Sequence, residues 1–181
     1  MSQLVTDHLR LRLLDARDAA LYCGLYTCPR VMANIGPPLD GTRATRAFAA
    51  TLAHNTRDVP GHRAFAVFDR VDATPVGIGA LMREGARAEI GLMLLPAAWD
   101  GRRSHEVLDA LLVHAFVSRG LQAVDAVCRE GPNVRPSRRL LRPYGFTEVP
   151  QSLAGTLRWE LRRDAWQARG CPMVGRVAVA G

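Results

Sequence analysis

The fold of this chain is decided by residues 86 to 106, which read Ala-Arg-Ala-Glu-Ile-Gly-Leu-Met-Leu-Leu-Pro-Ala-Ala-Trp-Asp-Gly-Arg-Arg-Ser-His-Glu. The apolar run 90–95 is typical of a buried strand that ends at Pro96, and a turn containing Gly101 follows. A helix comes next, and its apolar residues share one face: Val107, Leu108, Leu111, Leu112, Ala115 and Phe116. Strand, tight loop and helix in this order direct backbone N–H groups at one point, where the helix dipole favours an anion. The stretch therefore predicts a site for a phosphorylated cofactor, with the Glu89 carboxylate nearby as a candidate general base.

Strands and helices are predicted in alternation on both sides of this stretch. Residues 9–13 alternate apolar and basic side chains, which indicates a half-buried strand, and residues 40–55 show the amphipathic pattern of a helix. We expect further helices at 15–25, 29–35, 104–118 and 136–142. We expect further strands at 62–68, 75–82, 121–128, 146–149 and 156–161. Residues 1–170 are predicted to form one domain, and the weakly patterned residues 171–181 a mobile tail.

Five segments, in this order and spacing, resemble those of one enzyme superfamily. They are Thr6 to Leu14 with Asp18, Cys28 to Met32 with Ile35-Gly36, Pro75 to Gly79, Ala88-Glu89-Ile90 with the turn after it, and Asn133 to Leu141 with Gly145-Phe146. The superfamily is that of the GNAT acyl-CoA N-acyltransferases, in the RimJ/RimL-type, ribosomal-protein N-acetyltransferase-like branch. The resemblance implies an α/β domain of the GNAT fold, in which helices flank a mixed, mostly antiparallel central sheet.

The resemblance also implies acetyl-CoA as co-substrate, although the loop for its pyrophosphate departs from the family pattern. Arg102 stands where the family has a glycine, and Ser104 stands where it has glycine or alanine. Arginine there either obstructs the close backbone approach that glycine permits or meets the phosphates directly, and a one-residue slip onto Gly101 is a third alternative. The residues expected to bind the cofactor are Leu92, Met93 and Leu94, through their backbone along a splayed strand, with Gly101, Arg102, Arg103, Ser104, His105 and Asn133.

Two side chains are candidates for proton transfer, which an acyl transfer from a thioester to an amine requires. Glu89 matches the glutamate that acts as general base in many GNAT enzymes, and the alternative is that it faces solvent or pairs with Arg87. Ser137 resembles the serine of an Asn-x-x-Ser motif that protonates the leaving thiolate, but Asn133 lies one residue too early. The alternative for Ser137 is a helix cap beside Pro136.

Composition and charge fit a globular enzyme and argue against other classes. The 181 residues include 48% hydrophobic and 23% charged side chains, and the net charge of +7 comes with 24 arginines and no lysine. A basic surface raises the local concentration of a polyanionic cofactor. Without an arginine-rich block or an aromatic platform, nucleic-acid binding is not the expected role.

The sequence shows no targeting signal, no membrane span and no metal-binding motif. The first 14 residues carry charges, so no signal-peptide core is predicted, and no run approaches the roughly 20 apolar residues of a membrane span. We therefore expect a cytoplasmic protein. The cysteines lack Cys-x-x-Cys spacing and neighbouring histidines, so we expect free thiols and no metal site: Cys23, Cys28, Cys128 and Cys171.

Some aromatic side chains and histidines carry weaker expectations. Trp99 and Tyr144 are expected to pack beneath their turns. His54 and His62 flank a loop that is expected near the entrance of the acceptor, where either could assist catalysis.

The function expected from these features is transfer of an acetyl group from acetyl-CoA to a primary amine, either a protein N-terminus or a small amine. Direct attack by the amine is expected, because no cysteine stands where an acyl-enzyme would need one. The altered loop leaves a second interpretation open, a degenerate, non-catalytic GNAT domain that serves binding or regulation. The sequence also leaves a homodimer open.

Overall fold

The computed structural model describes residues 3–33, 35–57, 61–99, 102–132, 134–150, 155–170 and 177–180. Its strands are β1 (Gln3–Val5), β2 (Leu9–Leu13), β3 (Arg63–Asp69), β4 (Pro75–Glu84), β5 (Arg87–Leu94), β6 (Ala123–Arg129), β7 (Thr147–Val149), β8 (Thr156–Arg162) and β9 (Ala178–Ala180). Its helices are α1 (Ala19–Thr27), α2 (Pro29–Met32), α3 (Gly41–Asn55), α4 (Arg102–Val113), α5 (Val134–Leu141) and α6 (Arg163–Ala168). Short turns of helix lie at Ala16–Asp18, Pro96–Ala98, His114–Ser118 and Arg142–Tyr144.

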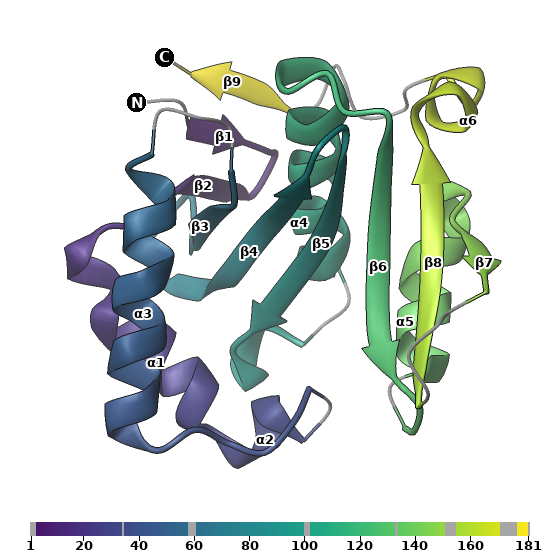
Figure 1. Cartoon of the computed structure of the whole chain (residues 1–181). Helices are drawn as coiled ribbons and strands as arrows, with labels where there is room; N and C mark the ends of the chain where they lie inside the picture. Colours follow the sequence, from purple (N-terminus) through teal and green to yellow (C-terminus); the bar gives the residue numbers. More distant parts are fainter. Residues whose placement is uncertain are drawn as a thin grey trace.

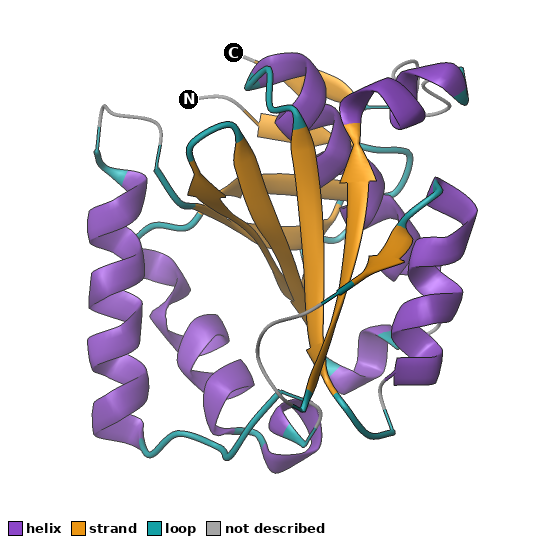
Figure 2. Cartoon of the chain, turned by 45° about the vertical axis from the view of Figure 1, so that its right-hand side comes forward, coloured by secondary structure: helices purple, strands orange, loops and turns teal. Residues whose placement is uncertain are grey.

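The described strands form one mixed, mostly antiparallel sheet in the order β7-β8-β6-β5-β4-β3-β2-β1-β9 (Figure 1). Among these strands only β5 and β6 pair in parallel. Helices lie on both sides of the twisted sheet (Figure 2). The predicted α/β architecture with flanking helices is thus confirmed.

Two apolar cores hold the helices on the sheet. On one face, Tyr22 of α1 and Phe48 of α3 pack with Ala66 and Ile78 of the sheet. On the other face, α4 buries the apolar stripe that its sequence predicted, including Leu108 at 0% exposure. Each face of the sheet therefore has its own hydrophobic layer. On the first face, α1 to α3 pack against β3, β4 and β5.

The parallel pair β5–β6 is short, and this divides the sheet. The register runs from Arg87 opposite Ala123 to Glu89 opposite Asp125, and no further pair follows among the described residues. Beyond Glu89 the two strands diverge, as Figure 1 shows. β5 continues to Leu94 with β4 as its partner, so one edge of its last five residues faces the opening.

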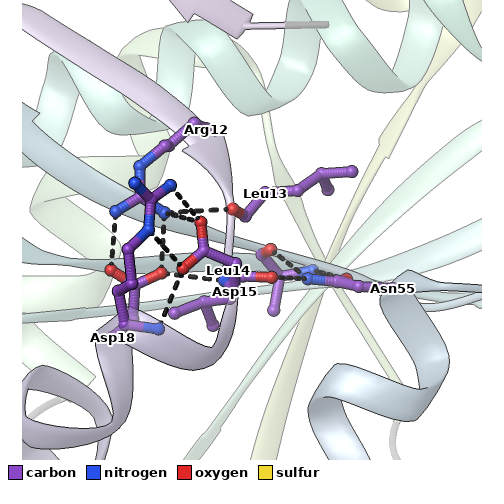
Figure 3. Close-up of polar contacts among 8 residues, drawn as sticks. Arg12, Leu13, Leu14, Asp15, Asp18 and Asn55 are labelled. Carbon is purple, nitrogen blue, oxygen red and sulfur yellow. Dashed lines mark hydrogen bonds and ion pairs between the residues drawn. The ribbon is translucent and has the colours of Figure 1, made fainter. Parts of the chain in front are cut away.

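Polar contacts fix the start of α1 and the end of α3 to β2 and β3 (Figure 3). The guanidinium of Arg12 on β2 donates to both carboxylate oxygens of Asp18, at 2.7 and 2.8 Å, and Asp18 is only 4% exposed. The side-chain amide of Asn55, the last residue of α3, donates to the carbonyls of Leu14 and Ala64, at 3.1 and 2.9 Å. Such charged and amide contacts give α1 and α3 defined positions, and α1 carries one wall of the site described below.

Several elements differ from the sequence-based expectations. β1 and α6 were missed because short segments at element ends give a weak periodic signal. The segment 171–181 was expected to be a mobile tail, but Ala178–Ala180 form β9, which pairs with β1, and Val177 is buried. The expected helix 104–118 begins at Arg102, and its last turn, His114–Ser118, is a π-helix.

Gly77 shows why a strand residue without a side chain is needed next to β5. A Cβ atom at this position would lie 2.2 Å from the carbonyl oxygen of Met93, a backbone atom that cannot rotate away. We therefore expect Gly77→Ala to lower the free energy of unfolding by about 1–3 kcal/mol. The measurement is urea unfolding followed by circular dichroism.

A glycine in open surroundings provides the matched control. No atom lies within 4 Å of a Cβ built on Gly24, which is inside α1. Gly24→Ala is expected to raise the free energy of unfolding by about 0.5–1 kcal/mol, because alanine favours the helix. Equal losses in both variants would contradict the close approach of β4 to β5.

Candidate active site

A cleft of about 1020 Å³ opens where β5 and β6 diverge. It brings together most of the residues that the sequence singled out, from the three elements β5, α4 and α5: Glu89, Leu92, Met93, Leu94, Ser104, His105 and Ser137. Gly101 and Asn133, which were also predicted to bind the cofactor, lie outside the described residues. A volume in this range suits a small-molecule or cofactor site.

Glu89 lies at the fork of the two strands, as the last residue of the β5–β6 register. It lines the cleft and is the single carboxylate among the described residues that do so. Burial raises the pKa of Glu89, the nearby Asp125 carboxylate raises it further, and Arg158 opposes them. The Glu89 side chain is also exposed, as the solvent-facing alternative expected, so its role as a general base stays a prediction.

The neighbours of Glu89 form a separate network of charges on β5, β6 and β8. Asp125 is 6% exposed and accepts from Arg87 at 2.7 Å and from Arg158 at 3.2 Å. Arg87 also pairs with Glu160. The expected alternative of an Arg87–Glu89 pair is therefore wrong, because the Arg87 guanidinium is directed to Asp125 and Glu160. The network leaves Glu89 free to face the cleft.

The opposite wall of the cleft is formed by the first turn of α4. Ser104 and His105 line the cleft, and the N–H groups of such a turn have no partner within the helix. Tyr144 donates from its hydroxyl to the carbonyl of His105 at 3.1 Å, and the two rings stack with centroids 5.8 Å apart. Burial lowers the pKa of His105, and Arg139 lowers it further, so the imidazole is held neutral. This turn can receive an anionic group.

The two arginines of the predicted phosphate loop have different positions. Arg102 is exposed at the first residue of α4 and does not line the cleft. Arg103 is half-buried and pairs with Asp69 on β3, at 3.5 Å. The Arg102 side chain therefore does not fill the described cleft.

Ser137 lies on α5 and lines the cleft beside Cys128 of β6. The helix begins at Val134, so the alternative of Ser137 as its cap is wrong. Burial raises the pKa of the Cys128 thiol, and the neighbouring Ser137 hydroxyl opposes that rise. The role of Ser137 as a proton donor to a thiolate stays a prediction.

Cys128 modifies one expectation from the sequence. A cysteine does line the cleft, although none was expected near the reacting atoms. Its raised pKa keeps the sulfur as the neutral thiol, which is a poor nucleophile. Direct attack therefore remains the preferred mechanism on different grounds.

One side of the cleft is apolar, and part of it lies in residues 27–60, where the sequence led us to expect the substrate segments. Its residues are apolar and come from α1, the segment around α2, β4 and the turn after β5: Tyr26, Val31, Ile35, Met82 and Trp99. Trp99 was expected to pack beneath its turn, but it is 47% exposed, and its indole N–H donates to the carbonyl of Leu94 at 2.9 Å. In the structure, Ile35 and Met82 are exposed apolar side chains. Such side chains indicate a binding surface only where several of them lie together.

Two histidines lie away from this cleft. His54 and His62 contact each other, with ring centroids 4.6 Å apart, and neither lines the cleft. They therefore lie outside this candidate site, and their part at an acceptor entrance stays a prediction. Within the described part of the chain, no group of three or more His, Cys, Asp or Glu residues could hold a metal ion. A search of the same residues finds no helix with the length and apolarity of a membrane span.

Comparison with known proteins agrees with this architecture. A family model described as the acetyltransferase (GNAT) domain matches residues 8–147. An uncharacterized N-acetyltransferase of Bacillus licheniformis, p20, is 27% identical over 150 residues, which cover 81% of this chain and 83% of p20.

Solved structures of low sequence identity share the fold. The spermidine N-acetyltransferase of Vibrio cholerae, solved with CoA and spermine, has a TM-score of 0.73 and 16% identity over 88% of this chain and 98% of its own. A second Vibrio cholerae structure, provisionally named a ribosomal-protein-serine acetyltransferase, has a TM-score of 0.68 and 22% identity over 88% and 97%. Since the family model spans most of the chain, including β5, the fork and α4, this protein belongs to the GNAT family of N-acetyltransferases.

Proposed function

We propose that this protein transfers an acetyl group from acetyl-CoA to a primary amine, which is a small amine or a protein N-terminus, as in the RimJ/RimL-type branch. One observation carries the proposal. A single cleft places the Glu89 carboxylate, the Ser137 hydroxyl and the first turn of α4 around the fork between β5 and β6. Family membership supports acyl-CoA as the donor.

The cofactor is proposed to lie along the open edge of β5. Backbone groups of Leu92, Met93 and Leu94 would receive the extended pantetheine arm, as a sheet edge receives an added strand. The pyrophosphate would lie at the first turn of α4, with Arg102, Arg103, Ser104 and His105 around it. Gly101 and Asn133 complete this proposed set.

The reaction is proposed to be a direct transfer. Glu89, through a water molecule, would accept the proton of the amine, whose nitrogen attacks the thioester carbonyl carbon. The carbon–sulfur bond then breaks, and the Ser137 hydroxyl would supply a proton to the leaving thiolate. No covalent acyl-enzyme is involved, because the cysteine in the cleft is held as the thiol.

Calorimetric titration with acetyl-CoA, and with free CoA for comparison, tests the cofactor site. Binding in the micromolar range is expected. An amine screen that follows the release of free thiol then tests the transfer itself. Absence of binding up to millimolar acetyl-CoA would overturn this proposal and favour the second candidate, a non-catalytic GNAT module, which rests on the altered loop at Arg102.

Arg102 provides a separate prediction about the loop. We expect Arg102→Ala to raise the Kd for acetyl-CoA about three- to tenfold at low salt, because an exposed guanidinium–phosphate contact is lost. The salt dependence of binding should also become weaker. Arg46→Ala is the control, since Arg46 is exposed on α3 and does not line the cleft. Tighter binding by Arg102→Ala would instead mean that the arginine obstructs the phosphates.

A further inference from the structure

The acceptor end of the cleft has an unusual balance of polar and apolar groups. Its described wall is apolar, with Tyr26, Val31 and Ile35 on one side and Met82 across from them on β4. Glu89 is the one acid among the described residues that line the whole cleft. An amine can therefore find a single anionic partner there, at the fork.

The charges beside Glu89 largely neutralise one another. Arg87, Arg158, Asp125 and Glu160 form the network of two cations and two anions described above. Because facing strand residues point to the same side of a sheet, Glu89 lies on the same face as Asp125, its partner in the register. The network thus contributes no net charge to the acceptor end.

Arg129 is an exposed cation on the same strand as Asp125, and it does not itself line the cleft. Two other cations lie nearby: Arg139 lines the cleft, and the guanidinium carbon of Arg30 lies 5.6 Å from the ring centroid of Trp99. Arg129 is the last residue of β6, four residues after Asp125 and hence on the same face. Its Nη1 atom lies 3.9 Å from the position that a Cβ atom on Gly36 would occupy, so the guanidinium reaches across to the segment after α2. No hydrogen bond or ion pair of its side chain is found within the described residues.

The acceptor end therefore offers an anion, Glu89, at the fork, and a cation, Arg129, beside the segment that carries the cleft-lining Ile35. Asp125, which lies opposite Glu89, and Arg129 are four residues apart on β6, which corresponds to about 13 Å along the strand at about 3.3 Å per residue. The two side chains shorten this distance, so a ligand that meets both needs several bonds between its charged ends.

We propose, on the basis of the acetyl-transfer function above, that the acceptor is an amine with a carboxylate at its far end and an apolar chain between the two groups. The amine lies at Glu89 and the carboxylate pairs with Arg129. A polyamine fits this end poorly, because its second ammonium group would lie beside a guanidinium and apolar side chains without a carboxylate to receive it.

Three acceptors of equal chain length test this proposal: aminohexanoate, hexylamine and diaminohexane. They differ only in the far group, which is negative, neutral or positive. We expect kcat/KM to be highest for aminohexanoate, about tenfold above hexylamine, which corresponds to one charge-assisted hydrogen bond. Diaminohexane is expected to be the poorest of the three.

Variants of Arg129 assign this preference to its guanidinium. In Arg129→Gln, kcat/KM for aminohexanoate is expected to fall to within about twofold of hexylamine, whose own value stays constant. Arg129→Glu is expected to reverse the order, with diaminohexane above aminohexanoate. Arg46→Gln on α3 serves as the control and should leave all three values unchanged.

Other outcomes distinguish a wrong acceptor class from a wrong reaction. If hexylamine or diaminohexane is preferred and the Arg129 variants keep that order, this inference is overturned while amine acetylation stands. If Arg129→Gln raises the Kd for acetyl-CoA and lowers all three rates alike, Arg129 serves the cofactor and the inference is again overturned. Failure to acetylate any amine, with acetyl-CoA bound, would overturn the proposed function as well.

Discussion

Glu89→Gln is expected to lower kcat for acetyl transfer about a hundredfold to a thousandfold, while the Kd for acetyl-CoA stays constant. Glutamine keeps the size and polarity of the side chain but cannot accept the proton of the amine. Steady-state kinetics at saturating donor, combined with calorimetry, measure both quantities. Glu84→Gln is a matched control, since Glu84 is exposed at the end of β4 and does not line the cleft.

The pH profile gives a second readout of the same residue. Because burial and Asp125 raise the pKa of Glu89, the wild-type kcat should fall with decreasing pH at a point above the ordinary range for glutamate. The fall occurs because protonated Glu89 cannot accept a proton. Glu89→Gln should lose this acid limb. A full-rate Glu89→Gln enzyme, or one that retains the limb, would remove Glu89 from the mechanism.

Ser137→Ala is expected to lower kcat about a hundredfold, with unchanged affinity for acetyl-CoA, because the leaving thiolate loses its proton donor. The loss should be smaller with an acyl donor whose thiol is more acidic, since that thiolate leaves without help. A purely structural role of Ser137 would not produce this dependence on the donor. Equal losses with both donors would therefore contradict its proposed role.

Cys128→Ala completes the test of the serine. Cys128 lies beside Ser137 in the same cleft, and its thiol is kept protonated by burial. The variant should retain activity within about threefold if the amine attacks the thioester directly. Loss of activity comparable to that of Ser137→Ala, or a labelled acetyl group trapped on the wild-type protein, would show that the cysteine takes part.

Much of the fold could be predicted because its signals are local. The apolar stripe of α4, the capping Asp40 before α3 and the left-handed Gly85 between β4 and β5 each act within a few residues. The short segments β1, β9 and α6 could not be predicted in the same way. β1 and β9 pair with each other from opposite ends of the chain, and this contact has no sequence signature.

The candidate site also has a part that could be predicted from the sequence and a part that could not. Glu89, Ser104, His105 and Ser137 were proposed from motifs, and all four line one cleft. The motif does not determine whether Arg102 obstructs that cleft, because the direction of a long side chain depends on the residues that surround it in the folded protein. Of the apolar wall, Val31 and Ile35 lie in the expected substrate segments at 27–60, but Met82 and Trp99 could not be assigned to it, since single apolar residues on separate elements carry no pattern.

By itself, the sequence determined the order and type of the main elements and the chemical groups available for acetyl transfer. These follow from backbone preferences and hydrophobic periodicity, which act over short stretches of chain. Only the tertiary structure decided where β5 and β6 part, and hence which groups meet at the cleft. In the tertiary structure, Arg87 also pairs with Asp125 and not with Glu89, and Arg129 lies near Gly36. Such contacts depend on packing and charge between segments far apart in the chain, and no local pattern encodes them.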